Sequence, residues 1–154
     1  IRCSCGGYGC FETVVSPEAL INAAYEAYKE HPESSIYEKA QQGKLEYIDI
    51  FNAANQGDSF SCALMDRIAR YFAILIHNIT LLHDPQNVII EGVYTEAGDY
   101  FLSSIRRALN DMPIYKIKRN LNITFSTPDP ENAFLSGASS YAADTYFDNE
   151  DLYI

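Results

Sequence analysis

The apolar residues of this chain recur every three or four positions over most of its length, which is the spacing of one face of an α-helix. The pattern is longest between residues 58 and 82, where it lasts for about seven turns. Asp58 precedes it as a helix cap, and His83, Asp84 and Pro85 end it. The pattern predicts one long helix that contributes to the core. Its apolar positions are Leu64, Ile68, Phe72, Leu75, Ile79 and Leu82.

Other segments show the same spacing over shorter stretches. Ser16 followed by Pro17 and Glu18 predicts a helix start, because serine caps a helix, proline suits its first position and an acid suits its positive end. Gly43 interrupts the pattern in the segment after this helix, so two short helices are expected there. The additional helical segments predicted in this way are residues 17–29, 36–55, 95–112 and 131–147.

Two short segments have the pattern of strands. Residues 87–90 are rich in β-branched side chains and suit a buried strand, whereas residues 122–126 alternate between polar and apolar. The order helix, strand, helix, strand, helix predicts an α/β layer with parallel strands. Because two strands are too few for such a sheet, we expect further strands to be encoded before Ile1. The acidic segment at residues 148–154 is expected to form a frayed tail.

Composition and charge narrow the possible partners. The chain has 154 residues, of which 47% are hydrophobic, so it has the size and apolar content of one folded unit. Its formal charge of −10 opposes contact between this segment and DNA or anionic lipid. The longest apolar run, residues 71–82, is shorter than the roughly 20 residues that span a bilayer. We therefore expect no membrane partner.

The first residues and the cysteines indicate the compartment. The chain begins at Ile1 without the pattern of a signal peptide, and we expect it to be the C-terminal part of a longer protein. Cys3 and Cys5 are too close in sequence to form an easy disulfide with each other, and Cys62 lies within a helical pattern. A cytoplasmic location is therefore expected.

The residues that could bind a metal are concentrated in residues 1–12, where Cys3, Cys5 and Cys10 lie on a glycine-rich loop. The glycines allow the backbone to turn back so that the thiols converge, and thiolates are good zinc ligands. Zinc needs a fourth ligand, and none of the three histidines is well placed in sequence to supply it. The spacing predicts a zinc knuckle. Reduced cysteines without a metal remain the alternative.

The run CxCGxxGCxE at residues 3–12 resembles the signature of the ROK family, which groups bacterial sugar-responsive repressors with sugar kinases. The resemblance extends over nearly the whole chain and implies the C-terminal part of an actin-like ATPase, or ribonuclease H-like, domain. Such a part is helix-rich and has few strands, because the rest of the sheet lies upstream. Weaker landmarks agree in order, namely Gly57-Asp58, Asp84-Pro85, the glycine after residues 88–90, and Ser136-Gly137-Ala138 at the opening of the last helix.

The resemblance implies roles for residues of the loop. Cys3, Cys5 and Cys10 would hold a structural zinc ion together with a histidine upstream of Ile1, so a chain that starts at Ile1 is expected to bind zinc less tightly. Glu12 would accept hydrogen bonds from sugar hydroxyls, a role that suits the two acceptor oxygens of a carboxylate. From residue type alone, a solvated glutamate in the first turn of a helix is the simpler interpretation of Glu12.

The resemblance leaves two main functions open. Kinases of the family are expected to have a Gly-Gly pair after the first strand, where this chain has Glu91-Gly92, and a carboxylate there repels nucleotide phosphates. We therefore expect a non-enzymatic, sugar-binding effector domain of a transcriptional regulator, with an upstream helix-turn-helix that binds DNA. In the alternative, a sugar kinase, Gly92, Gly137 and Ala138 would line the nucleotide site.

A third possibility is an oligomerisation domain that has lost sugar binding. Family resemblance implies a homodimer or a higher homo-oligomer. From the sequence alone, the apolar stripe of the long helix is more simply explained as facing its own core.

Overall fold

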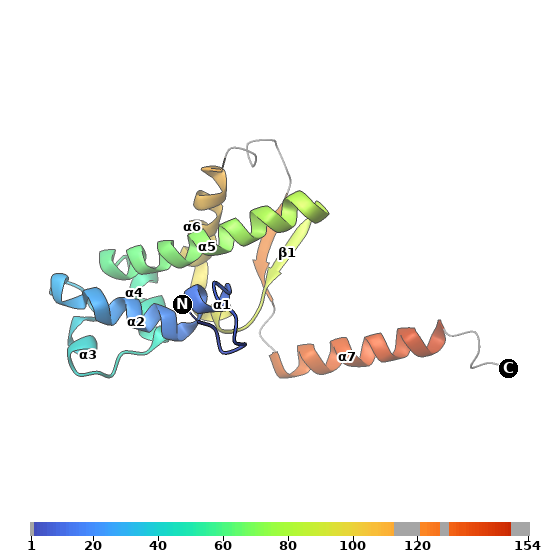
Figure 1. Cartoon of the computed structure of the whole chain (residues 1–154), viewed down its shortest axis with the longest axis horizontal. Coiled ribbons are helices and arrows are strands. Elements are labelled where there is room, and N and C mark those ends of the chain that lie inside the picture. The colour runs from blue at the N-terminus through green and yellow to red at the C-terminus, as the bar shows by residue number, and fades with distance from the viewer. Residues whose placement is uncertain (1, 113–120, 127–129, 149–154) are drawn as a thin grey trace.

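The computed structural model of the chain describes residues 2–112, 121–126 and 130–148, with a body of helices grouped around one long helix and a two-stranded sheet (Figure 1). Helices provide most of this structure because the sequence has helical periodicity over most of its length. In chain order the elements are α1 (Glu12–Val15), α2 (Pro17–Ala27), η1 (Tyr28–Glu30), α3 (Tyr37–Gln41), α4 (Tyr47–Asn55), α5 (Ser59–His83), β1 (Asn87–Ile90), η2 (Val93–Ala97), α6 (Gly98–Asn110), β2 (Asn122–Phe125) and α7 (Pro130–Phe147).

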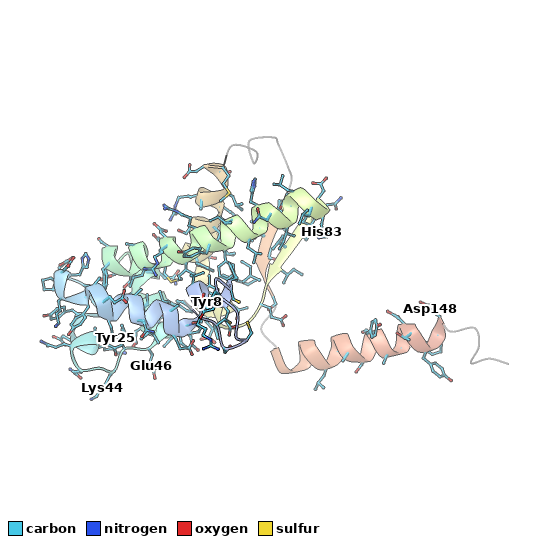
Figure 2. The ribbon with its side chains drawn as sticks, in the orientation of Figure 1. Tyr8, Tyr25, Lys44, Glu46, His83 and Asp148 are labelled. Carbon is cyan, nitrogen blue, oxygen red and sulfur yellow. The ribbon has the colours of Figure 1, made fainter. Side chains whose placement is uncertain are left out.

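The long helix α5 is the centre of the core, which confirms the helix predicted from the seven-turn apolar pattern. It contacts α1, α2, α4 and α6, and Met65, Ile68 and Ile76 on it are buried. In Figure 2, its last residue, His83, lies on the opposite side of the helical body from Tyr25 and Lys44. Because four helices pack against one, the position of each depends on how α5 is held.

Local capping fixes where the helices begin. The side chain of Ser16 accepts a hydrogen bond from Ala19 N at the start of α2, as predicted. Asp58 accepts from Ser61 N at 2.8 Å at the start of α5, again as predicted. The predicted interruption at Gly43 separates α3 from α4. These boundaries depend on neighbouring residues only, which is why the sequence predicts them correctly.

The two strands lie side by side and parallel, with Asn87 opposite Asn122 and Ile90 opposite Phe125, which confirms the predicted direction. The prediction that residues 87–90 are buried is wrong for most of the strand. Ile90 is buried, but Ile89 is 66% exposed. Successive side chains of a strand point to opposite faces, and the face on which Ile89 lies is uncovered in the described part of the chain. Hydrophobic composition alone does not reveal whether both faces are covered.

The last helix, α7, confirms the predicted helix at residues 131–147 and extends to one side of the other elements (Figure 1). Residues 135–148 of this segment are exposed, and Asp148 marks its end (Figure 2). Residues 149–154, which make up most of the predicted frayed tail, lie outside the described residues. Of the helices that are described, none has the length and apolar content required to cross a membrane.

A cluster of buried and partly buried aromatic rings joins four of the elements. Tyr94 of η2 lies 5.0 Å from Phe101 of α6, 5.1 Å from Phe72 of α5 and 5.5 Å from Phe51 of α4, measured between ring centroids. Phe51 and Phe101 are almost completely buried. Rings at these separations add attraction to the burial of their surface. The cluster therefore holds the connection after β1 against the helices.

The side chain of Asn55, at the end of α4, fixes the start of α6. Its amide group donates to Ala97 O at 2.8 Å, and its oxygen accepts from Tyr100 N at 3.2 Å. Gly98 adopts a φ of +74°, and a Cβ at this position would lie 2.6 Å from the Asn55 side chain. Two constraints, backbone conformation and space, therefore require glycine at residue 98.

We predict that Gly98→Ala destabilises the protein by about 2–4 kcal/mol, because the new methyl group meets Asn55 and the backbone conformation is unfavourable. Gly43→Ala is the matched control, since Gly43 has a φ of +69° with open space around it. The control should lose only about 1 kcal/mol. Urea unfolding measures both, and equal losses would show that the Asn55 contact is unimportant.

We predict that Asp58 makes the free energy of unfolding depend on pH in the acidic range. Partial burial raises the pKa of Asp58, but hydrogen bonds from Ser61, Ser35 and Ser34 outweigh it and lower the pKa to about 2. Because the folded pKa lies below the unfolded value of about 3.9, the stabilisation is complete above that value and is lost as pH falls towards 2.

Asp58→Asn is the test, because asparagine can still cap α5 but carries no charge. The free energy of unfolding in urea should fall more between pH 5 and pH 3 in the unmodified protein than in this variant. An identical fall in both proteins would contradict the role of Asp58.

Candidate metal and ligand site

The first described residues form a tight loop that closes on itself. Cys3 N donates to Gly7 O at 2.9 Å, and Gly6 N donates to Cys3 O at 3.0 Å. Arg2 pairs with Tyr8 in an antiparallel bridge, and the exposed Tyr8 lies in the loop (Figure 2). Gly6 has a φ of +88°, a conformation that other residues rarely adopt. The glycines therefore make possible the reversal that the sequence predicts.

This reversal brings the three predicted cysteines together. The sulfur atoms of Cys3, Cys5 and Cys10 all lie within 4.8 Å of one another, and those of Cys5 and Cys10 are 3.6 Å apart. Cys3 is buried, Cys5 is exposed and Cys10 is half-buried. Within residues 2–112, 121–126 and 130–148, they are the only group of three or more potential metal ligands. The loop could hold a metal ion that prefers sulfur.

The thiols differ in how readily they lose a proton. Hydrogen bonds from the backbone and side chain of Cys5 lower the pKa of Cys3. The hydrogen bond to Cys5, together with that to Cys3, raises the pKa of Cys10. A metal ion binds thiolates rather than thiols, so binding would release protons and become tighter as the pH rises.

Glu12 lies directly beside the cysteines as the first residue of α1. Cys10 O accepts hydrogen bonds from Thr13 N at 3.0 Å and from Thr13 Oγ1 at 2.6 Å, which ties the loop to the helix. The Glu12 carboxylate is exposed, and its Oε2 is 3.9 Å from Cys3 Sγ. The structure thus presents one carboxylate to solvent at the edge of the cysteine loop.

The residues predicted for a nucleotide site lie on separate elements. Glu91 and Gly92 follow β1, where both are exposed and Gly92 has a φ of +84°. Gly137 and Ala138 lie inside α7, not at its opening, and are exposed. Figure 1 shows α7 apart from the body that contains β1 and η2. In the described part of the chain, Gly92 therefore lies on a different element from Gly137 and Ala138.

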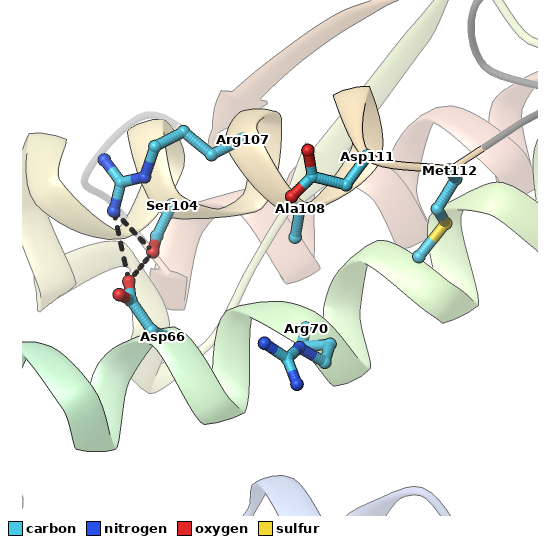
Figure 3. A pocket seen from close by; sticks show the side chains of 7 residues that line it. All are labelled: Asp66, Arg70, Ser104, Arg107, Ala108, Asp111 and Met112. Carbon is cyan, nitrogen blue, oxygen red and sulfur yellow. Dashed lines mark hydrogen bonds and ion pairs between the residues drawn. The ribbon is translucent and has the colours of Figure 1, made fainter.

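A cavity that the sequence did not predict lies between α5 and α6, with a volume of about 440 Å³. Figure 3 shows Asp66 at its edge accepting hydrogen bonds from Ser104 and from Arg107, the latter at 3.1 Å. Tyr100 also donates to Asp66, at 3.1 Å. Because these residues come from two helices far apart in sequence, no local motif marks them. The contacts between them hold α6 against α5.

A second cavity, of about 350 Å³, lies between the cysteine loop, α1 and α2. Arg2 and Arg67 line it together with Glu18 and Glu26, so its charges are mixed. Thr13, the residue after Glu12, also borders this cavity. Glu12 itself does not line this cavity.

The parallel strand pair and the helices around α5 define the chain as part of an actin-like ATPase fold, a likeness shared with solved sugar kinases. The ROK glucokinase from Streptomyces griseus, solved with glucose and AMPPNP, superposes with a TM-score of 0.71. It is 22% identical, and the match covers 90% of this chain and 48% of that chain. This likeness supports the fold predicted from the resemblance.

The sequence model of the ROK family matches residues 1–144, and the chain belongs to this family. A glucokinase from Halalkalibacterium halodurans is 36% identical over 68% of this chain. The N-acetylglucosamine repressor of Escherichia coli O6:H1 is 27% identical over 86% of it. The chain spans 32% of the length of each of these two relatives. The family is therefore established, and it contains both kinases and repressors.

We predict that the metal affinity of the cysteine loop depends on Cys5. Cys5→Ser removes one of three converging thiolates and should lower the bound metal by at least about tenfold at equal free metal concentration. Cys62→Ser is the control, because Cys62 lies on α5 and its thiol donates to Ala54 O. Metal analysis after dialysis measures both variants. Equal metal content in the two would contradict the site.

Proposed function

We propose that the chain is the sugar-binding effector domain of a ROK transcriptional regulator, in which Glu12 binds the sugar. The observation that favours this role over a kinase is the exposed Glu91 at the carboxyl end of β1. The family membership and the similarity to a repressor support it. Sugar binding would shift the population between conformations of different DNA affinity, so the domain performs no chemical step.

Glu12 suits sugar recognition because of its chemistry and position. An ionised carboxylate has two acceptor oxygens that can hold adjacent hydroxyl groups, and the side chain of Glu12 is exposed to solvent. It is the acidic residue that follows directly on the cysteine loop. We infer that the loop positions this carboxylate and that the remaining sugar contacts come from other parts of the full-length protein.

Zinc is the metal that we propose for the loop, in a structural role. In a tetrahedral site with Zn–S bonds of about 2.3 Å, the sulfurs lie roughly 3.8 Å apart. The 3.6 Å separation of Cys5 Sγ and Cys10 Sγ is close to this value. A histidine from the part of the protein before Ile1 would complete the site. Four protein ligands leave no position for substrate, so the ion would brace the loop rather than act on the sugar.

Glu91 argues against nucleotide binding. A carboxylate at the carboxyl end of a parallel strand lies where α/β proteins of this kind bind ligands, and it would repel phosphates. Gly92 is needed for the turn itself, because its φ is +84°. Gly92 is therefore required by the backbone conformation of the turn, while the side chain of Glu91 disfavours close approach of phosphate oxygens.

The remaining features of the proposal follow from the regulator role. DNA would be bound by a helix-turn-helix in the upstream part of the protein, since the charge of this chain is −10. A homodimer or a higher homo-oligomer would present two such elements to the operator. The protein would act in the cytoplasm, where its DNA target and the reduced thiols are found.

A sugar kinase is the second candidate function. The observation in its favour is the 36% identity to a glucokinase. In that case Gly92, Gly137 and Ala138 would line the nucleotide site after α7 is brought against the body by the rest of the protein. The two functions differ in one measurable property, the transfer of phosphate from ATP to sugar.

We predict that the full-length protein binds a sugar and that Glu12→Gln weakens this binding at least about tenfold, because an uncharged amide accepts hydrogen bonds less strongly than a carboxylate. Calorimetry with D-glucose, N-acetyl-D-glucosamine and D-xylose measures the affinity. Glu38→Gln is the matched control, since Glu38 is an exposed acid in the first turn of α3 and lines neither of the two cavities described above.

The same preparation tests the choice between regulator and kinase. Incubation with ATP, Mg²⁺ and the bound sugar should give no sugar phosphate above the blank. Kinases typically turn over at about 1 s⁻¹ or faster. Sugar phosphate formed at such a rate would make the protein an enzyme and overturn the regulator proposal. Unchanged sugar affinity in Glu12→Gln would instead overturn the role of Glu12.

A further inference from the structure

The helix that carries Glu12 is too short to hold its own position. α1 has four residues, Glu12–Val15, which is about one turn. A single turn gains too few hydrogen bonds to offset the ordering of its backbone, so isolated helices of this length are unstable in water. The orientation of the Glu12 carboxylate must therefore depend on contacts that α1 makes with other elements.

Two contacts on the core side hold this turn at its two ends. Before it, the ring of Phe11 meets the ring of Phe72 on α5 edge to face, with 5.3 Å between centroids. After it, the hydroxyl of Tyr94 donates a hydrogen bond to the carbonyl of Val15. Phe72 and Tyr94 themselves belong to the aromatic cluster described above, with 5.1 Å between their centroids. The Glu12 turn is thus fixed at both ends to one rigid group of rings.

The bond from Tyr94 is energetically significant because of where it lies. Tyr94 is 5% exposed and Val15 is 7% exposed, so water does not readily replace the hydroxyl. Carbonyls at the last turn of a helix have no partner within the helix. If the hydroxyl were removed, the buried Val15 carbonyl would lose this donor, and the loss would cost folding free energy. Burial also raises the pKa of Tyr94, so the hydroxyl keeps its proton and remains a donor.

We propose that Tyr94 is a positioning residue for Glu12, which links the sugar-binding carboxylate to the connection between β1 and α6. This inference rests on the proposed sugar-binding role of Glu12. Tyr94 lies in η2, two residues after Gly92, and 79 residues separate it from Val15. A shift of η2 relative to α5 would move the end of α1 and so change the affinity at Glu12. By linkage, sugar binding would favour the matching position of η2 with an equal coupling free energy.

The test is a double-mutant cycle in the full-length protein, with Tyr94→Phe, Glu12→Gln and the double variant. Calorimetry with D-glucose, N-acetyl-D-glucosamine and D-xylose identifies the sugar that binds, and titrations up to high millimolar sugar give each Kd. Tyr94→Phe should raise Kd about five- to tenfold, the effect of one lost buried hydrogen bond. In the Glu12→Gln background it should change Kd less than about twofold, because the group that it positions is already altered.

Two controls separate positioning from general damage, and a second variant is available if the first does not fold. Tyr100→Phe also removes a tyrosine hydroxyl donor, in this case an exposed one to Asp66 on α5, and its Kd should stay unchanged. Metal content should be the same in all variants. Should Tyr94→Phe fail to fold, Phe72→Leu removes the contact at the other end of the turn and is expected to raise Kd in the same non-additive way.

The outcomes distinguish this inference from the function on which it rests. Equal Kd in Tyr94→Phe and the unmodified protein, with weaker binding in Glu12→Gln, would overturn the positioning role and leave the proposed function standing. An equal multiplication of Kd in both backgrounds would show a merely structural role and also overturn it. Absence of sugar binding in the unmodified protein would overturn both. Normal binding in Glu12→Gln would overturn the proposed role of Glu12, and this inference with it.

Discussion

The contact on which the rest of this structure depends is the packing of the rings of Phe51, Phe72, Tyr94 and Phe101 at the centre of the helical body. These rings come from α4, α5, η2 and α6, and aromatic rings contribute large buried surfaces. Through Phe11, the same cluster reaches the end of the cysteine loop. The turn that carries Glu12 and the connection after β1 are therefore held by one group of side chains.

The cysteine loop illustrates how backbone and side-chain requirements combine. Its glycines permit the reversal, the reversal brings three sulfur atoms together, and the following turn places Glu12 at the edge of the loop. The reversal needs glycine, the metal site needs cysteine and the exposed acceptor needs a carboxylate, and residues 3–12 contain all three. Because all of these residues are close in sequence, the geometry of the thiols could be predicted, whereas the fixation of the next turn by the core could not.

Helix positions were predictable because their causes are local. The Asp58 cap, the proline after Ser16 and the interruption at Gly43 act within a few residues, and the described helices begin and end near them. The burial of β1 was predicted wrongly for a complementary reason. Isoleucine and valine favour a strand whether or not both faces are covered, and coverage depends on which elements pack there. The cavity between α5 and α6 was missed because Asp66 and Arg107 meet only in the folded chain.

The sequence by itself determined the helices, the parallel strands, the convergence of Cys3, Cys5 and Cys10, and the family to which the chain belongs. Only the tertiary structure decided which distant groups meet, such as Tyr94 with Val15 and Asn55 with Gly98. The physical reason is that periodicity, caps and turns arise from interactions between near neighbours. A hydrogen bond across 79 residues leaves no periodic trace in the sequence, because its two partners are brought together by the packing of whole helices.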